Sequence, residues 1–335
     1  MSTMSSRPLN IVIVGGGISG LAAAAWLREE HNVTVKIFES EEYTSCHWRS
    51  DQVLEKYPLN LEANVTNDYG MSLVCNAYKL LLSQGANEEN LQAVVFTHVS
   101  LVFHTSRNKY SWCWSIVQLW DKSKDNEALR EMEFDTRKTF GIPSIFARRS
   151  RLQAELHRFA TDPSRPGKPV KIITDVKIKS LDPIAGIAVT DLGETYTGDL
   201  IIGADGINSS IRAAVIARAE IGVSEGTEDV PTGLVGYVTQ VAASVIASDP
   251  NLAFQASADG IAGICGWSGP PDSQLKVICY PCDDKSYFQV IAYAPETPWV
   301  EEFEKNHSNI VNNVPKERLL QEFQGFHPTV LKILG

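Results

Sequence analysis

Residues 9–39 read LNIVIVGGGISGLAAAAWLREEHNVTVKIFE. The apolar run Leu9–Val14 has the length and composition of a buried strand, and a glycine-rich turn follows it directly. Leu21–Glu30 then has the composition of a helix, and Asn32–Phe38 that of a second strand. Because strands joined through a helix run parallel, this βαβ pattern predicts an α/β fold built on a parallel sheet.

The turn after the first strand has the spacing G-x-G-x-x-G, through Gly15, Gly17 and Gly20. In such a turn the glycines permit a tight bend, the close approach of a pyrophosphate, and close packing of helix on strand. Glu39 follows the second strand, where a carboxylate accepts hydrogen bonds from a ribose and repels a 2′-phosphate. The motif therefore predicts a dinucleotide site, with a purely structural glycine turn as the alternative.

The composition narrows the class of partner. The chain has 335 residues, enough for about two domains, and 44% of them are hydrophobic, enough for a sizeable core. Its 30 basic and 40 acidic residues give a net charge of −10, which argues against nucleic acid and anionic membranes as partners, because both bind basic surfaces. We therefore expect a small-molecule substrate; the oligomeric state is unknown.

The cysteines and the N-terminus bear on the compartment. Six cysteines are too few for a disulfide scaffold in a chain of this length, which favours a reducing environment. The first ten residues are polar and lack the apolar core of a signal peptide, and no apolar stretch is long enough to span a bilayer. We therefore expect a cytoplasmic protein with no membrane span.

Later segments predict further elements. Residues 70–82, GMSLVCNAYKLLL, and Arg149–Ala160 have helix-like patterns, whereas residues 94–120 show no clean period. After about residue 225 short strands alternate with turns, which is typical of an antiparallel sheet. The predicted strands there are Gly233–Val241, Ala262–Trp267, Leu275–Tyr280 and Tyr287–Ala294.

Two later motifs combine charge with a predicted element boundary. RRSRL, residues 148–152, places cations in the first turn of a helix, where they oppose the helix dipole. Either an anionic group compensates them or the turn is simply solvated. LIIGADG, residues 200–206, places Asp205 at the carboxyl end of a strand, where ligands bind in α/β sheets. An ordinary Asp-Gly turn is the alternative.

In this order the motifs resemble those of FAD-dependent aromatic monooxygenases of the salicylate-hydroxylase and p-hydroxybenzoate-hydroxylase type. The resemblance rests on GGGISGLAAAAWL (15–27) with Glu39, GMSLVCNA (70–77), RRSRL (148–152) and GADGINSSIR (203–212), and more weakly on GLVGYV (233–238), CYP (279–281) and residues 299–334. It implies that Arg149 contacts the flavin and that Asp205 serves both flavin and pyridine nucleotide. The cofactor-binding residues that it implies are Gly15, Gly17, Gly20, Glu39, Gly70, Arg149, Asp205 and Gly206.

The resemblance also implies a fold and an activity. We expect an α/β protein with a Rossmann-like FAD-binding domain over 1–225, whose core is 1–45 and 140–225 with 46–139 intervening. A mostly antiparallel substrate sheet over 226–300 and a C-terminal helical segment over 301–335 would follow. NAD(P)H would reduce the FAD, and an oxygen atom of O2 would pass to a small aromatic or polyprenyl substrate in secondary metabolism. The cofactor carries this chemistry, so no catalytic side chain is assigned.

Three places depart from the family pattern. The family continues beyond the equivalent of HPTVLKILG (327–335) into a Gly-Asp flavin motif, so we expect a shortened member with impaired FAD affinity or activity. Residues 99–120 stand where the family has a short strand pair and are expected to be an insertion. Val238 stands where related enzymes often carry an arginine, so a substrate anion would lose a partner.

Other interpretations stay open. One is a degenerate flavoprotein fold without catalysis, and another is an NAD(P)-dependent reductase that uses the Gly15 turn without a flavin. Cys279 and Cys282 have the spacing of a metal or redox pair, but no second pair or histidine cluster accompanies them. We therefore expect no metal site.

Overall fold

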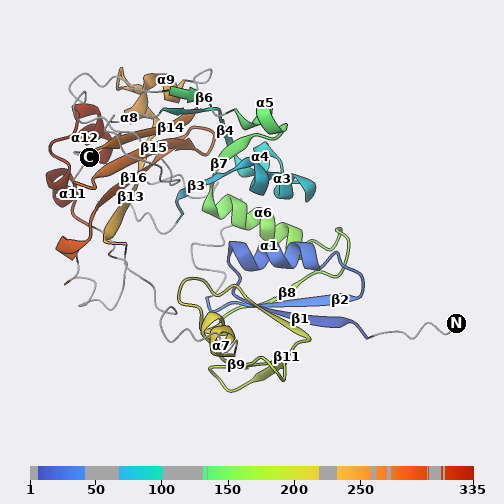
Figure 1. Ribbon diagram of the computed structural model, residues 1–335. Coiled ribbons are helices and arrows are strands. Elements are labelled where there is room, and N and C mark those ends of the chain that lie inside the picture. The colour runs from blue at the N-terminus through green and yellow to red at the C-terminus, as the bar shows by residue number, and fades with distance from the viewer. Residues whose placement is uncertain are drawn as a thin grey trace. The chain divides into compact units, whose positions relative to one another are not determined.

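The computed structural model describes residues 7–41, 68–100, 131–133, 135–218, 232–257, 262–269, 273–299, 301, 311 and 314–335. Its contacts divide the chain into two compact units. The first unit is Met1–Pro58 with Ser150–Val230, and the second is Leu59–Arg149 with Pro231–Gly335. Each unit is therefore built from two separate stretches of the chain (Figure 1).

The first unit contains a parallel sheet in the order β12-β1-β2-β8. Its strands are β1 (Leu9–Val14), β2 (Val33–Phe38), β8 (Lys171–Ile173) and β12 (Leu200–Gly203). The predicted βαβ unit is confirmed, with α1 (Ile18–Leu27) joining β1 to β2. Ile11–Val14 is buried throughout, as expected of a parallel strand covered on both faces.

A second, antiparallel sheet in the first unit has the order β11-β10-β9. It consists of β9 (Ile178–Asp182), β10 (Ile187–Thr190) and β11 (Thr195–Thr197). Val12, Val14 and Phe38 of the parallel sheet share a buried cluster with Ile178 and Ala188. Figure 1 accordingly shows α1 on one face of the parallel sheet and β9–β11 on the other. The helices α6 (Arg149–Thr161), from its second residue onward, and α7 (Ser210–Arg218) complete this unit.

The second unit contains a six-stranded sheet in the order β13-β16-β15-β14-β5-β6. Its strands are β5 (His98–Ser100), β6 (Glu131–Glu133), β13 (Leu234–Ala242), β14 (Gly263–Ser268), β15 (Lys276–Cys282) and β16 (Tyr287–Pro295). All neighbours are antiparallel except β14 and β5. The four strands predicted after residue 225 are confirmed, with ends shifted by at most two residues.

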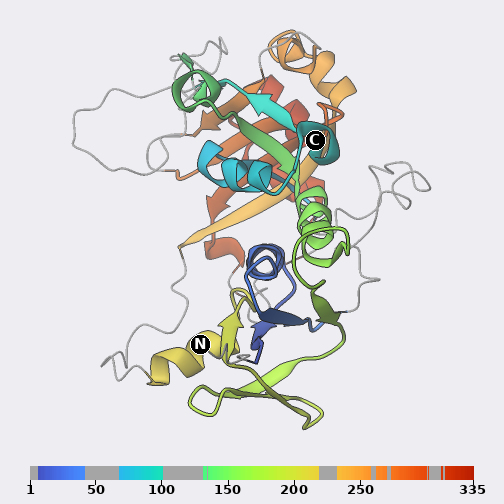
Figure 2. The ribbon, with the colours of Figure 1, turned by 90° about the vertical axis from the view of Figure 1, so that its right-hand side faces the viewer.

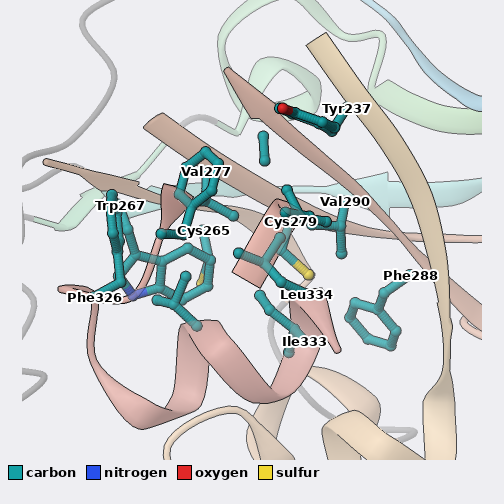
Figure 3. Packing of buried hydrophobic residues seen from close by; sticks show 14 of the residues in the cluster. Tyr237, Cys265, Trp267, Val277, Cys279, Phe288, Val290, Phe326, Ile333 and Leu334 are labelled. Atoms are coloured by element: carbon teal, nitrogen blue, oxygen red, sulfur yellow. The ribbon is translucent and has the colours of Figure 1, made fainter. Parts of the chain in front are cut away.

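Both faces of this sheet carry buried side chains. One face packs Val277, Cys279 and Val290 against Ile333 and Leu334 of a C-terminal helix (Figure 3). Five short helices contribute residues to the cluster on this face. They are α8 (Ala243–Ala247), α9 (Ala253–Ala256), the 3-10 helix η1 (Thr297–Trp299), α11 (Lys316–Glu322) and α12 (Pro328–Leu334). Contacts on both faces explain why β16 is buried at each of its first four positions, Tyr287–Val290, before burial alternates.

The other face packs against a small sheet in the order β3-β7-β4. Its strands are β3 (Gly70–Leu73), β4 (Val94–Phe96) and β7 (Ser144–Arg148), accompanied by α3 (Cys75–Ser83), α4 (Glu88–Leu91) and α5 (Thr136–Phe140). Figure 2 shows the green β7 in front of the orange and red strands of the larger sheet. The ring of Phe146 stacks on Phe96 at 4.3 Å and on Tyr280 at 4.7 Å.

Two expectations differ from this arrangement. The helix predicted over 70–82 is wrong for its first four residues, since Gly70–Leu73 pairs with β7 and the helix begins at Cys75. We also expected 46–139 to belong with the first domain, but residues 68–100 group with the second unit. The reason is that β3 and β4 pair with β7, and side chains of β4 and β7 pack on the larger sheet. Residues 101–120 of the predicted insertion lie outside the described residues.

Candidate functional site

Three sequence motifs meet at the carboxyl edge of the parallel sheet. The amide of Gly15 donates to the carbonyl of Phe38 at 2.8 Å, and the amide of Ala204 donates to the carbonyl of Val14 at 2.7 Å. These bonds join the ends of β1, β2 and β12, so the Gly15 turn, Glu39 and Asp205 follow neighbouring strand ends. The structure therefore brings the first-unit candidates together at the edge where α/β sheets bind ligands.

The three glycines of the turn differ in what surrounds them. Gly15 has a φ of +103°, and a Cβ there would strike the carbonyl oxygen of Ala204. A Cβ on Gly20 would strike the carbonyl oxygen of Gly15, whereas a Cβ on Gly17 would meet nothing within 4 Å. Packing therefore requires glycine at two positions, while the third faces open space.

That open space lies at the start of α1. Gly17 is the N-cap of this ten-residue helix, and no side chain caps it. The first amide groups of a helix lack partners within the helix, and together with the helix dipole they favour an anion. The turn therefore fits a pyrophosphate, which needs backbone amides and close approach more than it needs side chains.

Glu39 lies directly beside this turn. Its Oε2 accepts a hydrogen bond of 2.6 Å from the amide of Gly16, and its Oε1 accepts from the amide of Glu41 at 3.0 Å and from the hydroxyl of Ser40 at 3.2 Å. Since a carboxylate oxygen can accept more than one hydrogen bond, these contacts orient the group and leave acceptor capacity for ribose hydroxyls.

Asp205 is held by its own turn. Its Oδ1 accepts from the hydroxyl of Ser209 at 2.5 Å, and its Oδ2 accepts from the hydroxyl of Ser210 and the amide of Ile211, both at 3.2 Å. Burial by itself raises the pKa of Asp205, but the hydrogen bonds outweigh it and lower the pKa. Gly206 follows at a φ of +82°. These contacts are those of the Asp-Gly turn interpretation, and a ligand role for Asp205 is still a prediction.

Gly70 and Arg149 lie together in the second unit. The amide of Arg149 donates to the carbonyl of Tyr69 at 3.0 Å, next to the register pair of Gly70 with Arg148. A Cβ on Gly70 would strike the Sγ of Cys282. Packing against the larger sheet therefore requires glycine at this position. We call Tyr69, Gly70 and Arg149 the β3–β7 corner.

The sequence analysis placed Arg148, as part of RRSRL, in the first turn of a helix, but in the structure it ends β7 and α6 begins at Arg149. The Arg148 side chain is buried and lies 3.3 Å from a carboxylate oxygen of Asp68 and 3.2 Å from one of Asp283. Its guanidinium also stacks on the ring of Tyr287 at 4.5 Å. Of the two alternatives for the RRSRL motif, anionic compensation thus applies to Arg148 and comes from carboxylates distant in sequence. A cation ending the apolar strand SIFAR is a local signal that could have identified it.

Cys279 and Cys282 do not form a common site. They lie three residues apart on a regular strand, so their side chains point to opposite faces of the sheet. Cys279 belongs to the cluster with Ile333 and Leu334, and Cys282 to the cluster with Phe146. Within the described residues no group of three or more His, Cys, Asp or Glu side chains could hold a metal ion.

Val238, at the position where related enzymes often carry an arginine, lies on β13 with 47% of its surface exposed. It follows Tyr237, whose side chain points into the opposite, buried face.

None of the helices in the described part of the chain is long and apolar enough to cross a bilayer.

Comparisons with known proteins agree with the fold and the motifs. Residues 13–79 match the family model of an NAD(P)-binding Rossmann-like domain. The chain is 26% identical to hispidin-3-hydroxylase of Neonothopanus nambi, over 97% of this chain and 67% of that protein. It is 25% identical to the FAD-dependent monooxygenase cfoG of Aspergillus candidus, over 99% of this chain and 65% of that protein.

Solved structures show the same fold. The structure of FqzB covers 98% of this chain with a TM-score of 0.62 at 14% identity, and 63% of its own chain is matched. A salicylate hydroxylase substrate complex also covers 98% of this chain, with a TM-score of 0.58 at 19% identity and 66% of its own chain matched. The chain thus spans about two thirds of the length of the proteins that it resembles. In sequence the chain is similar to fungal FAD-dependent monooxygenases, and in fold it is similar to a salicylate hydroxylase.

Proposed function

We propose that this protein is an FAD-dependent monooxygenase that uses NAD(P)H and O2 to hydroxylate or epoxidise a small aromatic or polyprenyl substrate in secondary metabolism. The observation that carries the proposal is the open space at Gly17, in front of the uncapped start of α1 and beside the carboxylate of Glu39. The fungal monooxygenases and the hispidin hydroxylase among its relatives support the reaction class.

The first unit would hold the ADP half of FAD. The amides at the start of α1 would bind the pyrophosphate, and Glu39 would accept hydrogen bonds from the adenosine ribose. A carboxylate at this position repels the 2′-phosphate of NADPH, so it favours FAD over NADPH at this turn. Gly70 and Arg149 would contact the flavin half.

The cofactor and the protein's side chains would have different roles. Bound FAD supplies the redox chemistry, in which it takes electrons from NAD(P)H and activates O2. The protein's side chains would bind and orient the cofactor and exclude water. Val238, apolar and half exposed, would favour an uncharged part of the substrate over an anionic one at its position.

Cofactor titration of the purified 335-residue chain tests the proposal. We expect FAD to bind with one equivalent per chain, to acquire a visible circular dichroism band, and to be reduced by NADH or NADPH. The test variant is Gly17→Ala. It adds a methyl group only to the open space and should weaken FAD binding without unfolding the chain. Binding of NADH or NADPH alone, with no FAD binding, would instead identify a flavin-independent reductase.

A further inference from the structure

The backbone of Gly70 is held by two side chains of the larger sheet in the same unit. The Oε1 of Gln289 accepts a hydrogen bond of 2.8 Å from the Gly70 amide, and the hydroxyl of Tyr280 donates one of 2.8 Å to the Gly70 carbonyl. The neighbouring residues Tyr69 and Arg149 share a ladder hydrogen bond, so both backbone groups of Gly70 point away from β7. On an edge strand such groups usually face water.

The two side chains that hold Gly70 are themselves fixed. Tyr280 and Gln289 are register partners on β15 and β16 and lie on the same face of the sheet. Gln289 is fully buried, and its Nε2 donates to the carbonyl of Thr239 at 2.8 Å and to that of Val290 at 3.3 Å. The ring of Tyr280 stacks on Phe146. The contacts to Gly70 therefore come from rigid, central strands.

A third residue packs against the α-carbon side of Gly70. The Sγ of Cys282, also on this face, occupies the space that a side chain at position 70 would need. Gln289 and Tyr280 thus hydrogen-bond the amide and the carbonyl of Gly70, and Cys282 leaves no room for a side chain there. Because the Tyr69 carbonyl accepts from the Arg149 amide, fixing Gly70 also fixes the backbone of Arg149.

Burying a glutamine in this strand is not the simplest way to build a core. An apolar residue of similar volume fills the same space, whereas a buried amide is tolerated only when its hydrogen bonds are made. Here those bonds are made to Gly70, for which the resemblance implies cofactor binding, next to the backbone of Arg149, for which it implies contact with the flavin. Cofactor sites require this support, because a contact residue displaced by a fraction of an ångström loses much of its effect.

We propose that Tyr280 and Gln289 are positioning residues that hold the β3–β7 corner in the geometry that the isoalloxazine end of FAD requires. This inference rests on the proposed function, namely that the chain binds FAD. Neither side chain need touch the cofactor, since each acts through the backbone of Gly70.

The test compares two buried tyrosines of the same sheet. Tyr280→Phe removes only the hydroxyl that reaches Gly70, and Tyr237→Phe removes a hydroxyl of β13 that is bonded to Glu322 and Trp299 instead. We expect both variants to fold and to lose a similar amount of stability. Only Tyr280→Phe should raise the Kd for FAD, by about tenfold, and change the visible circular dichroism of bound flavin.

Gln289→Met provides a second arm, because methionine nearly preserves the volume and removes the acceptor for the Gly70 amide. It should weaken FAD binding in the same direction and produce the same spectral change. The Kd and the visible circular dichroism report the surroundings of the bound flavin directly. A general loss of stability would leave those surroundings unchanged in the molecules that stay folded.

The outcomes separate the two proposals. If the wild-type chain binds no FAD, the proposed function fails and this inference fails with it. If the wild type binds FAD while Tyr280→Phe and Gln289→Met keep its Kd and spectrum, the function stands and the inference is overturned. Equal weakening of FAD binding by Tyr237→Phe and Tyr280→Phe would also overturn it, since the effect would then be general loosening of the sheet.

Discussion

The Nη1 atom of Arg28 donates a hydrogen bond of 2.9 Å to the carbonyl oxygen of Ala160, across 132 residues of sequence. The same atom donates to the carbonyls of Phe159 and Asp162, each at 3.0 Å. These carbonyls lie at the end of α6, where a helix leaves its last carbonyl groups without partners. Arg28 is only 1% exposed, so water cannot replace it.

Replacing Arg28 should therefore strongly destabilise the first unit. We expect Arg28→Met to lower the free energy of unfolding by about 3–5 kcal/mol, because the buried guanidinium no longer donates to these carbonyls, of which those of Ala160 and Asp162 keep one backbone amide donor each. Urea unfolding followed by circular dichroism measures the change. Arg7→Met is the matched control, since Arg7 is 70% exposed and pairs only at the surface with Asp199. Equal losses in the two variants would show that Arg28 contributes no more to the free energy of unfolding than the exposed Arg7 does.

The glycines of the first turn should separate folding from binding. Gly20→Ala would place a methyl group against the carbonyl of Gly15 and should prevent α1 from packing, which lowers the melting temperature sharply. Gly17→Ala meets no atom within 4 Å and should leave the melting temperature nearly unchanged while FAD affinity falls at least about tenfold. Thermal unfolding and FAD titration of both variants check this. Unchanged FAD affinity in Gly17→Ala would show that the pyrophosphate does not bind at this turn.

Tyr237 links three elements of the second unit. Its hydroxyl donates to Glu322 at 2.7 Å and accepts from the indole of Trp299 at 2.9 Å, which joins β13, η1 and α11. Tyr237→Phe should lower the free energy of unfolding by about 1–3 kcal/mol, because the buried indole N–H loses its acceptor. Urea unfolding measures the loss, and a shift in tryptophan emission reports the indole. Tyr196→Phe, which removes an exposed hydrogen bond to Glu194, is the control and should change little.

Alkaline pH should weaken the second unit. Burial raises the pKa of Cys282 to about 12 from its ordinary value of 9.0, and burial also raises the pKa values of Tyr280 and Tyr287. The folded state therefore keeps protons that the unfolded state releases, so this stability is complete below about pH 9 and is lost as the pH rises toward 12. The urea midpoint at pH 10.5 should therefore lie clearly below those at pH 7 and 9, which should differ little.

The variant Cys282→Ala tests the assignment of this effect. It removes one group with a raised pKa, so the decline of stability above about pH 9 should be shallower than in the wild type. Identical pH dependence in both proteins would mean that Cys282 is exposed to water in the folded chain.

Some elements could be predicted because their signals are local. Leu9–Val14 was predicted with its observed bounds, since a continuous apolar run ending in glycine has few other solutions. By contrast, Gly70–Leu73 was predicted as helix and is a strand, because its state depends on pairing with β7, more than 70 residues later. Periodicity within a segment carries no information about such a partner.

The sequence by itself determined the glycine turn and its neighbouring carboxylate. The spacing of Gly15, Gly17 and Gly20 and the position of Glu39 follow from a βαβ unit of adjacent residues. Only the tertiary structure decided what supports the β3–β7 corner. Gln289 and Tyr280 reach Gly70 across 219 and 210 residues. Such contacts depend on the register between distant strands, and that register is set by the packing of whole sheets rather than by any local pattern.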